Sequence, residues 1–308
     1  MQEQSVTRPW WSNLLRGGAI GVTEALPGIS GGTVALIVRV YDTLIDGAGH
    51  IFGSFRLLLT DLIRGRGIAR AGARFRQAEW RTIAPVLVGM AVFLVLAILL
   101  IEPLIGSYTQ VVYALFFGLV LGSLPIPYAE SGRRWRLRDY GFGLIMAAIA
   151  FTLAGLPQVQ LDPNPWIVAL GAAIAICALV IPGISGSFIL LTLGLYEPAL
   201  RAVRDVDLAY IAVFGAGAII GFGTFVQLLQ YLLTHRRHIT MVLLTGLMAG
   251  SLRALWPWSE DAVAGQPFPL WAVITALIVG FAAVSTLVWW ERRSLATGQL
   301  HRDGPRQL

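Results

Sequence analysis

Lysine is absent from this sequence, and cysteine, histidine and charged residues in general are scarce. All 23 basic residues are arginine, Cys177 is the single cysteine, and the four histidines show no ligand spacing. One cysteine excludes a disulfide within the chain and a cysteine metal site, and we assign no metal or other cofactor. We interpret the exclusive use of arginine as a compositional bias rather than as phosphate chemistry at every site.

Low charge goes with high hydrophobicity. Of the 308 residues, 13% are charged and 56% are hydrophobic, and the mean hydropathy is +0.71. A soluble chain of this length needs far more charge to cover its surface. Apolar runs at 166–181, 208–233 and 270–290 approach or exceed the about 20 residues that cross a bilayer. The composition predicts an all-α polytopic membrane protein.

The charge that is present favours a membrane protein with basic cytoplasmic loops. The pI near 10.0 is what such loops produce, and it does not indicate a nucleic-acid partner. The N-terminus shows no pattern of a cleaved signal peptide, so we expect it to stay attached and to start in the cytoplasm.

One short segment occurs twice and organises the chain. Pro27-Gly28-Ile29-Ser30-Gly31-Gly32-Thr33 returns as Pro182-Gly183-Ile184-Ser185-Gly186-Ser187-Phe188. The same offset of 155 residues brings Tyr41-Asp42 onto Tyr196-Glu197 without a gap. Each Pro-Gly pair divides an apolar segment into two pieces shorter than a span. The repeat therefore predicts two broken, re-entrant helices, at 10–45 and 166–200.

Loop charge predicts the topology. Complete spans are expected at 82–101, 110–124, 140–156, 208–233, 239–255 and 270–290. Arginine gathers at 64–81, 133–138, 235–238 and in the tail, and is absent from 102–109, 157–165 and 257–269. With the basic segments inside, the spans alternate, the first broken segment enters and leaves on the cytoplasmic side, and the second enters and leaves on the outer side. We expect 51–63 to be a separate amphipathic or short piece.

The expected architecture is a pair of inverted repeats. The first repeat covers 1–156 and the second 157–290, each with one re-entrant hairpin and three spans, followed by a mobile polar tail at 291–308. Both termini are then cytoplasmic. A second repeated stretch occurs at 118–124 and 246–252, in the middle span of each half, and it contains Gly-x-x-x-Gly both times. We interpret these glycines as sites of close helix packing.

The repeated tips are the candidate substrate site. Irregular backbone at membrane depth survives only where protein buries it or a polar cavity meets it. Half-helix ends with Ser, Thr and Gly offer N–H and hydroxyl donors to an anion. The candidate ligands of a phosphate or carboxylate are Gly28, Ser30, Gly31, Gly32, Thr33, Gly183, Ser185, Gly186 and Ser187. The simpler interpretation is that Pro-Gly turns the chain and Ser caps the next helix.

Ionisable residues in apolar surroundings are further candidates. Arg39 and Arg253 could neutralise a phosphate bidentately, although Arg253 could also reach outward to the interface. Glu24 could couple transport to protons or pair with an arginine. Supporting or coupling roles are open for Asp42, Tyr41, Tyr196 and Glu197, and interfacial solvation explains Asp42 and Glu197 equally well.

At these residues the chain resembles the bacterial PopT family, formerly a membrane family of unknown function. The resemblance rests on Glu24-x-x-Pro-Gly-Ile-Ser-Gly-Gly-Thr33, Tyr41-Asp42, the 118–125 stretch, and 182–197. It departs at Glu24, where the family usually has Asp, and at Arg39, where it usually has Gly. The resemblance implies a transporter, or flippase, that returns undecaprenyl phosphate across the bacterial cytoplasmic membrane. That activity would recycle the polyprenyl lipid carrier of cell-wall biogenesis.

Two other functions remain open at this stage. An undecaprenyl-pyrophosphate phosphatase also has inverted repeats and a Pro-Gly-x-Ser-Arg-Ser stretch, and it must neutralise the transferred phosphoryl group. Gly31 and Gly186 stand here where that family has its arginine, and no E-x-x-x-E pair is nearby. A transporter of small inorganic anions is the other alternative, because the same tips would bind such an anion.

Overall fold

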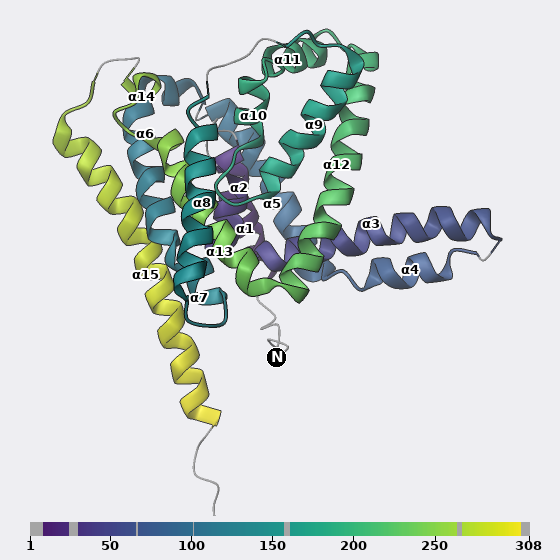
Figure 1. Cartoon of the computed structure of the whole chain (residues 1–308), viewed down its shortest axis with the longest axis horizontal. Helices are drawn as coiled ribbons and strands as arrows, with labels where there is room; N and C mark the ends of the chain where they lie inside the picture. The colour runs from purple at the N-terminus through teal and green to yellow at the C-terminus, as the bar shows by residue number, and fades with distance from the viewer. Residues whose placement is uncertain are drawn as a thin grey trace, which may run out of the picture.

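The computed structural model describes residues 9–24, 30–65, 67–100, 102–156, 161–263 and 267–302, and these residues form helices and connecting turns without a β-strand (Figure 1). The helices of the first half are α1 (Trp10–Glu24), α2 (Gly31–Ile37), α3 (Tyr41–Ile63), α4 (Ala69–Arg76), α5 (Trp80–Leu100), α6 (Glu102–Ser123), α7 (Pro125–Glu130) and α8 (Leu137–Leu153). Those of the second half are α9 (Pro165–Val180), α10 (Gly186–Thr192), α11 (Tyr196–Arg204), α12 (Leu208–His235), α13 (Arg237–Ser251), the 3-10 helix η1 (Leu252–Leu255), α14 (Glu260–Val263) and α15 (Leu270–Arg302).

Four helical segments of the described chain are long and apolar enough to cross a membrane. They are Trp80–Leu99, Tyr108–Glu130, Leu208–His235 and Arg237–Leu255, and two shorter apolar helices lie at Pro165–Val180 and Leu270–Thr286. Large apolar side chains such as Val92, Val95 and Leu99 are exposed on α5, where lipid would cover them. The prediction of an all-α polytopic membrane protein is confirmed. The span predicted at 140–156 corresponds to α8, which has 17 residues.

The long helices pack in pairs. Helix α1 lies along α5 and α9 along α12, while α6 lies along α15 and α13 along α8. In the last two pairs, a Cβ at Gly118 would meet the backbone of Leu277, and one at Gly246 would meet the backbone of Gly143. The predicted role of the two Gly-x-x-x-Gly stretches in close helix packing is therefore confirmed. The last helix of the first half, α8, packs on α13 of the second half, and the last helix of the second half, α15, packs on α6 of the first half.

Helices α2 and α10 match residue for residue at the offset of 155. Both have seven residues, and their N-caps Ser30 and Ser185 have nearly the same backbone angles, φ −97° and ψ 114° against φ −99° and ψ 129°. The side-chain oxygen of each serine accepts the backbone N–H three residues on, at 3.4 Å in both cases. The interpretation of these serines as helix caps is thus confirmed.

The C-terminal turns of these two helices also match. Val40 donates its N–H to the carbonyl of Ala35 at 3.0 Å, and Leu195 donates to Leu190 at 2.8 Å. Such a closing bond needs a left-handed residue just before it. That residue is Gly194 with φ 71° after α10, but Arg39 with φ 56° after α2. A side chain in this conformation costs roughly 1–2 kcal/mol.

Several predicted boundaries are wrong. The first broken segment ends at the turn 38–40, and α3 runs unbroken over 41–63 instead of stopping near residue 45. Its Gly47 and Gly49 are not breakers, because their missing side chains admit the side chains of Ile83 and Gln230.

Helix also replaces three segments expected to be irregular. The loop predicted at 102–109 is part of α6, with a kink at Tyr108. A proline in the first turn, here Pro103, is compatible with such a start. Helix α11 extends to Arg204 into the gap between the broken helix predicted at 166–200 and the span predicted at 208–233, and α15 continues to Arg302 through most of the predicted tail.

Candidate functional site

The two repeated tips touch each other inside the molecule. Ser30 donates its hydroxyl to the carbonyl of Ile181 at 3.2 Å. The N–H of Gly183 donates to the hydroxyl oxygens of Ser30 at 3.2 Å and of Thr33 at 2.8 Å. Two segments about 150 residues apart are therefore joined by direct hydrogen bonds between the predicted ligands.

The two tips differ in burial. Every residue of α2, Gly31 and Gly32 included, is buried, whereas in α10 only Gly186 is buried; the N-caps Ser30 and Ser185 are equally buried, each 6% exposed. In the first tip, Ser30 and Thr33 use their hydroxyls within the protein. In the second, Ser185 and Ser187 share a hydrogen bond of 2.9 Å with each other. The second tip is therefore the more accessible of the two. The predicted ligand Gly28 lies outside the described residues.

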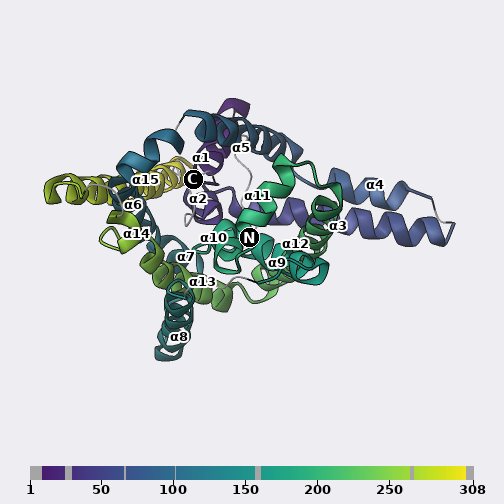
Figure 2. The same ribbon diagram turned by 90° about the horizontal axis from the view of Figure 1, so that it is seen from above.

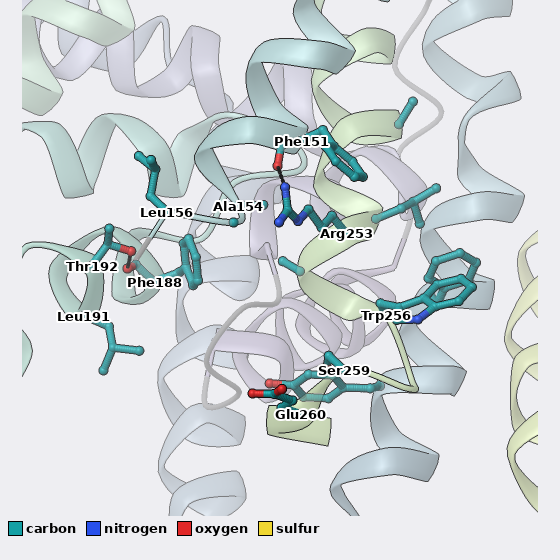
Figure 3. A pocket seen from close by; sticks show the side chains of 16 residues that line it. Phe151, Ala154, Leu156, Phe188, Leu191, Thr192, Arg253, Trp256, Ser259 and Glu260 are labelled. Atoms are coloured by element: carbon teal, nitrogen blue, oxygen red, sulfur yellow. Dashed lines mark hydrogen bonds between the residues drawn. The ribbon is translucent and has the colours of Figure 1, made fainter. Parts of the chain in front are cut away.

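A cavity of about 1110 Å³ opens beside the second tip (Figure 3). It is lined by residues of α6, α8, α10, α13, η1 and α14, and aromatic rings form much of its wall: Tyr113, Phe117, Phe151, Phe188 and Trp256. A smaller neighbouring pocket contains Gly183 and Ser185, and it shares Ala154 and Phe188 with the large one. The large, mainly apolar cavity is thus adjacent to the small pocket of about 30 Å³ at the second tip.

Arg253 supplies the positive charge of this cavity. Its Nη1 donates to the carbonyl oxygen of Phe151 at 3.0 Å, and its guanidinium carbon lies 4.5 Å from the centre of the Phe151 ring. Glu260 also lines the cavity, but Arg253 forms no ion pair with it or with any other carboxylate in the described part of the chain. The charge is therefore available to an anion that enters.

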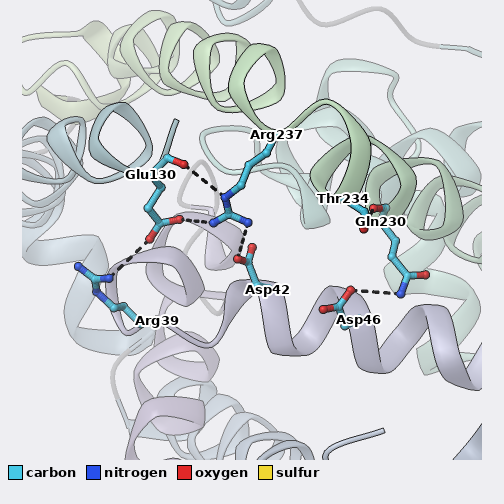
Figure 4. Close-up of polar contacts among 7 residues, drawn as sticks. All are labelled: Arg39, Asp42, Asp46, Glu130, Gln230, Thr234 and Arg237. Carbon is cyan, nitrogen blue, oxygen red and sulfur yellow. Dashed lines mark hydrogen bonds and ion pairs between the residues drawn. The ribbon is translucent and has the colours of Figure 1, made fainter. Parts of the chain in front are cut away.

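Arg39 does not line the cavity and lies in an ion cluster with residues of α3, α7 and α13 (Figure 4). Arg237 donates to Asp42 at 2.9 Å and to the carboxylate of Glu130 at 3.0 Å, and Arg39 lies 3.7 Å from the other oxygen of Glu130. A fourth contact of 3.1 Å joins Gln230 to Asp46. This cluster ties the α2–α3 turn to α7 and α13. The two predicted arginines, Arg39 and Arg253, are not brought together.

Glu130 and Arg237 were missed by the sequence reasoning. Both adjoin segments where arginine was counted only as evidence for cytoplasmic loops. Their place at the ends of apolar segments was the available signal, and only the fold shows that Asp42 meets them. The four residues Arg39, Asp42, Glu130 and Arg237 are called the basic-end cluster below.

Glu24 faces the start of α2, where it accepts the backbone N–H of Gly31. A Cβ at position 31 would collide with this carboxylate. Tyr41 is buried, and its hydroxyl has no hydrogen-bond partner within the described ranges. Tyr196 is half-buried and Glu197 is exposed at the start of α11. Across the described residues, no three His, Cys, Asp or Glu side chains gather as a metal site.

The chain is similar to one protein family and to two named relatives. The sequence model of a family described as undecaprenyl phosphate translocase-like matches residues 20–268. A polyprenyl-phosphate transporter of Vibrio cholerae is 35% identical over 257 residues, which cover 82% of this chain and 80% of that protein. A polyprenyl-phosphate transporter of Staphylococcus aureus is 25% identical over 295 residues, 90% of this chain and 95% of that protein. No solved structure matches the chain significantly.

Proposed function

The chain belongs to the undecaprenyl phosphate translocase-like family, and from this premise we propose that it carries undecaprenyl phosphate across the bacterial cytoplasmic membrane. The family and both relatives are named for transport, so the protein is a transporter and not an enzyme. The proposed direction is from the outer to the inner leaflet, which recycles the lipid carrier of cell-envelope synthesis.

The observation that carries the proposal is the arginine in an aromatic cavity. A phosphate headgroup needs a cation with several donors, and a guanidinium is suited to it. Arg253 lies in a space of about 1110 Å³, without a carboxylate partner among the described side chains. The headgroup would bind Arg253 first and then pass to Ser185 and Ser187, while the prenyl tail remains in lipid.

Charge distribution supports the sidedness of this proposal. The arginine-rich segments belong to α4, the α7–α8 loop, the α12–α13 junction and the last turns of α15, which lie toward the lower end of Figure 1. Helices α11 and α14 lie at the upper end, and α14 contributes to the cavity. With the basic end inside, the cavity faces the outer leaflet, and both termini are cytoplasmic.

The repeated contacts support two inverted repeats. The offset of 155 relates α1 and α2 to α9 and α10, whereas the offset of 128 that relates 118–124 to 246–252 places α5, α6 and α8 against α12, α13 and α15. The pair α1 and α5 then corresponds to the pair α9 and α12. The exchange of α8 and α15 between halves follows the same correspondence. Paired broken helices of this kind hold the substrate at the repeat interface in many transporters.

The local geometry also argues against phosphatase chemistry. An arginine at position 31 would have to displace Glu24, and a Cβ at position 186 would lie 2.5 Å from the carbonyl oxygen of Ala175. The two positions that carry arginine in the phosphatases have no room for it here. The cavity has no second cationic side chain among its lining residues to neutralise a transferred phosphoryl group.

A charge series at position 253 tests the proposed headgroup site. We expect Arg253→Gln to raise the half-saturating lipid concentration about tenfold or more, since a hydrogen bond to a charged group contributes about 1.5–3 kcal/mol. Arg253→Lys keeps the charge and should lose less. Transport would be measured in proteoliposomes with traceable undecaprenyl phosphate. If Arg253→Gln leaves the half-saturating lipid concentration unchanged, Arg253 does not bind the headgroup.

A further inference from the structure

The α3–α4 hairpin extends away from the rest of the molecule (Figures 1 and 2). Its base carries the basic-end cluster, and from there the outer half of α3 runs outward across the direction of α12 and α15. Helix α4 returns along it and packs against α3. The segment 51–76 is called the arm below. It is far from the cavity, so it has no part in enclosing the substrate.

The arm is a fixed hairpin. Asp61 of α3 is only 2% exposed and pairs with Arg70 of α4 at 3.3 Å. The guanidinium of Arg74 packs on Gly53, in the space that a side chain at position 53 would need. At the end of the arm, the indole of Trp80 donates to the carbonyl of Phe75 at 2.9 Å. These contacts hold the two helices in one orientation, so their outer faces are defined surfaces.

One of these surfaces is apolar. Phe55, Leu59 and Leu62 follow at helical spacing and are 57%, 51% and 63% exposed. On a helix these positions lie opposite Gly53 and Asp61, the residues that face α4. The apolar row therefore points away from α4. In Figure 1, α3 lies nearer than α4 to the end of the molecule that holds α11 and α14. The apolar row on α3 therefore faces the region that the membrane-spanning helices cross, and α4 lies on the opposite side of α3.

The arm is also strongly basic. Six arginines stand between residues 51 and 76 against one acidic residue, Asp61, and Asp61 is already paired with Arg70. Arg56 and Arg64 are exposed beside the apolar row and beyond its end, whereas Arg76 is exposed on α4. Two like-charged arms would repel each other. A membrane with anionic headgroups complements this surface twice, because its headgroups attract the arginines and its acyl chains accept the apolar row.

We propose that the arm lies in the lipid interface on the basic side of the membrane and binds anionic phospholipid headgroups through Arg56 and Arg64. A helix with an apolar row and flanking arginines lies in the plane of the interface. There it is attracted by anionic lipids of the cytoplasmic leaflet. The apolar row enters the acyl boundary, and α4 covers α3 from the water side.

Site-specific fluorescence on the whole protein tests this proposal. In a Cys177→Ser background, Leu62→Cys is labelled with an environment-sensitive dye, and the protein is placed in nanodiscs of phosphatidylcholine with or without phosphatidylglycerol. Ala73→Cys is the matched control, because Ala73 is exposed on α4 away from the helix contact made by Ala71 and Arg74. Nanodiscs expose both membrane faces to iodide, so the orientation of the protein does not affect quenching.

We expect the dye at Leu62→Cys to be blue-shifted and at least about fivefold less quenched with phosphatidylglycerol than without it, as one basic residue near an anionic surface contributes about that factor. Ala73→Cys should stay quenchable in both discs. The double variant Arg56→Gln with Arg64→Gln should abolish the effect of phosphatidylglycerol at Leu62→Cys. Arg76→Gln removes one positive charge from α4 and should leave that effect in place.

Three results would overturn the proposal. Full quenching of Leu62→Cys in both discs would mean that the arm lies in water. Equal protection with and without phosphatidylglycerol would mean that headgroup charge is not recognised. Protection found only in discs that hold two copies of the protein would assign the apolar row to self-association. Size-exclusion profiles of each variant check that the protein remains folded.

Discussion

Gly32 packs against the C-terminal end of α9, just before the second tip. A Cβ at this position would lie 2.9 Å from the carbonyl oxygen of Val180 and 3.2 Å from that of Leu179. We expect Gly32→Val to separate the tips, to lower the free energy of unfolding by about 1–3 kcal/mol, and to abolish transport while the protein still inserts. Proteoliposome transport and thermal unfolding in detergent measure the two effects.

Gly215→Val is the matched control for that substitution. Gly215 lies within α12, and nothing stands within 4 Å of its Cβ position. It should therefore insert and transport normally. Wild-type transport by Gly32→Val would refute the importance of the tip contact.

Arg39 is held in the left-handed region that Gly194 occupies in the second half, with φ 56° against 71°. Arg39→Gly and Arg39→Ala both remove the side chain and its ion pair with Glu130, but only glycine relieves the backbone. We predict that Arg39→Gly is more stable than Arg39→Ala by about 1 kcal/mol. Chemical or thermal unfolding of the two variants gives the difference, and equal stabilities would show that the turn is not strained.

Among the elements, the basic-end cluster is the contact that holds the α2–α3 turn against α7 and α13. Arg237→Gln leaves Asp42 and Glu130 facing each other without their shared cation. Because Arg237 is partly exposed, each pair is worth about 1 kcal/mol or less, so a stability loss of about 1 kcal/mol is expected. Arg236→Gln is the control, since Arg236 is exposed and forms no ion pair with the described residues. If both variants unfold alike, the cluster does not stabilise this end.

The sequence predicted the apolar helices well and their ends less well. Apolar length decides whether a helix crosses a bilayer, so the spans at 82–101, 208–233 and 239–255 correspond to α5, α12 and α13. The end predicted near residue 45 was wrong, since α3 continues through Gly47 and Gly49, whose missing side chains admit Ile83 and Gln230. The outward direction of α3 depends on its contacts with α4, which no periodicity contains.

For the candidate site, the repeat was the informative signal. It identified the tips that meet through Ser30, Thr33 and Gly183, because a duplicated motif with a constant register is visible in one sequence. The basic-end cluster was not predicted, since its four members come from α7, α13 and both sides of the α2–α3 turn. Burial could not be foreseen either: the two tips are alike in sequence, yet one is enclosed and the other borders a cavity.

At the scale of the whole molecule, that difference in burial predicts different access from the two sides. Leu36 of α2 is 2% exposed, whereas Leu191, its counterpart 155 residues on, lines the cavity. In a Cys177→Ser background, a membrane-impermeant maleimide added from the outer side should label Leu191→Cys at least about tenfold faster than Leu36→Cys, because burial blocks the reagent. Equal rates would contradict an outward-facing cavity.

Leu36→Cys also reports on the opposite state. If two inverted repeats exchange conformations, α2 becomes accessible from the basic side when α10 packs away. Arg237→Gln, which loosens the basic-end cluster, should then increase labelling of Leu36→Cys from that side. Arg236→Gln should leave the rate unchanged. If neither variant increases the labelling rate of Leu36→Cys, the basic-end cluster does not control access from that side.

The central claim is that the protein moves a polyprenyl phosphate without chemical change. The most direct measurement uses purified protein in liposomes that carry traceable undecaprenyl phosphate or its pyrophosphate, and follows leaflet location and released inorganic phosphate together. The account predicts that the monophosphate changes leaflet, that Arg253→Gln slows this movement, and that no phosphate is released. Phosphate released from the pyrophosphate, or a monophosphate that stays in its leaflet, would contradict it.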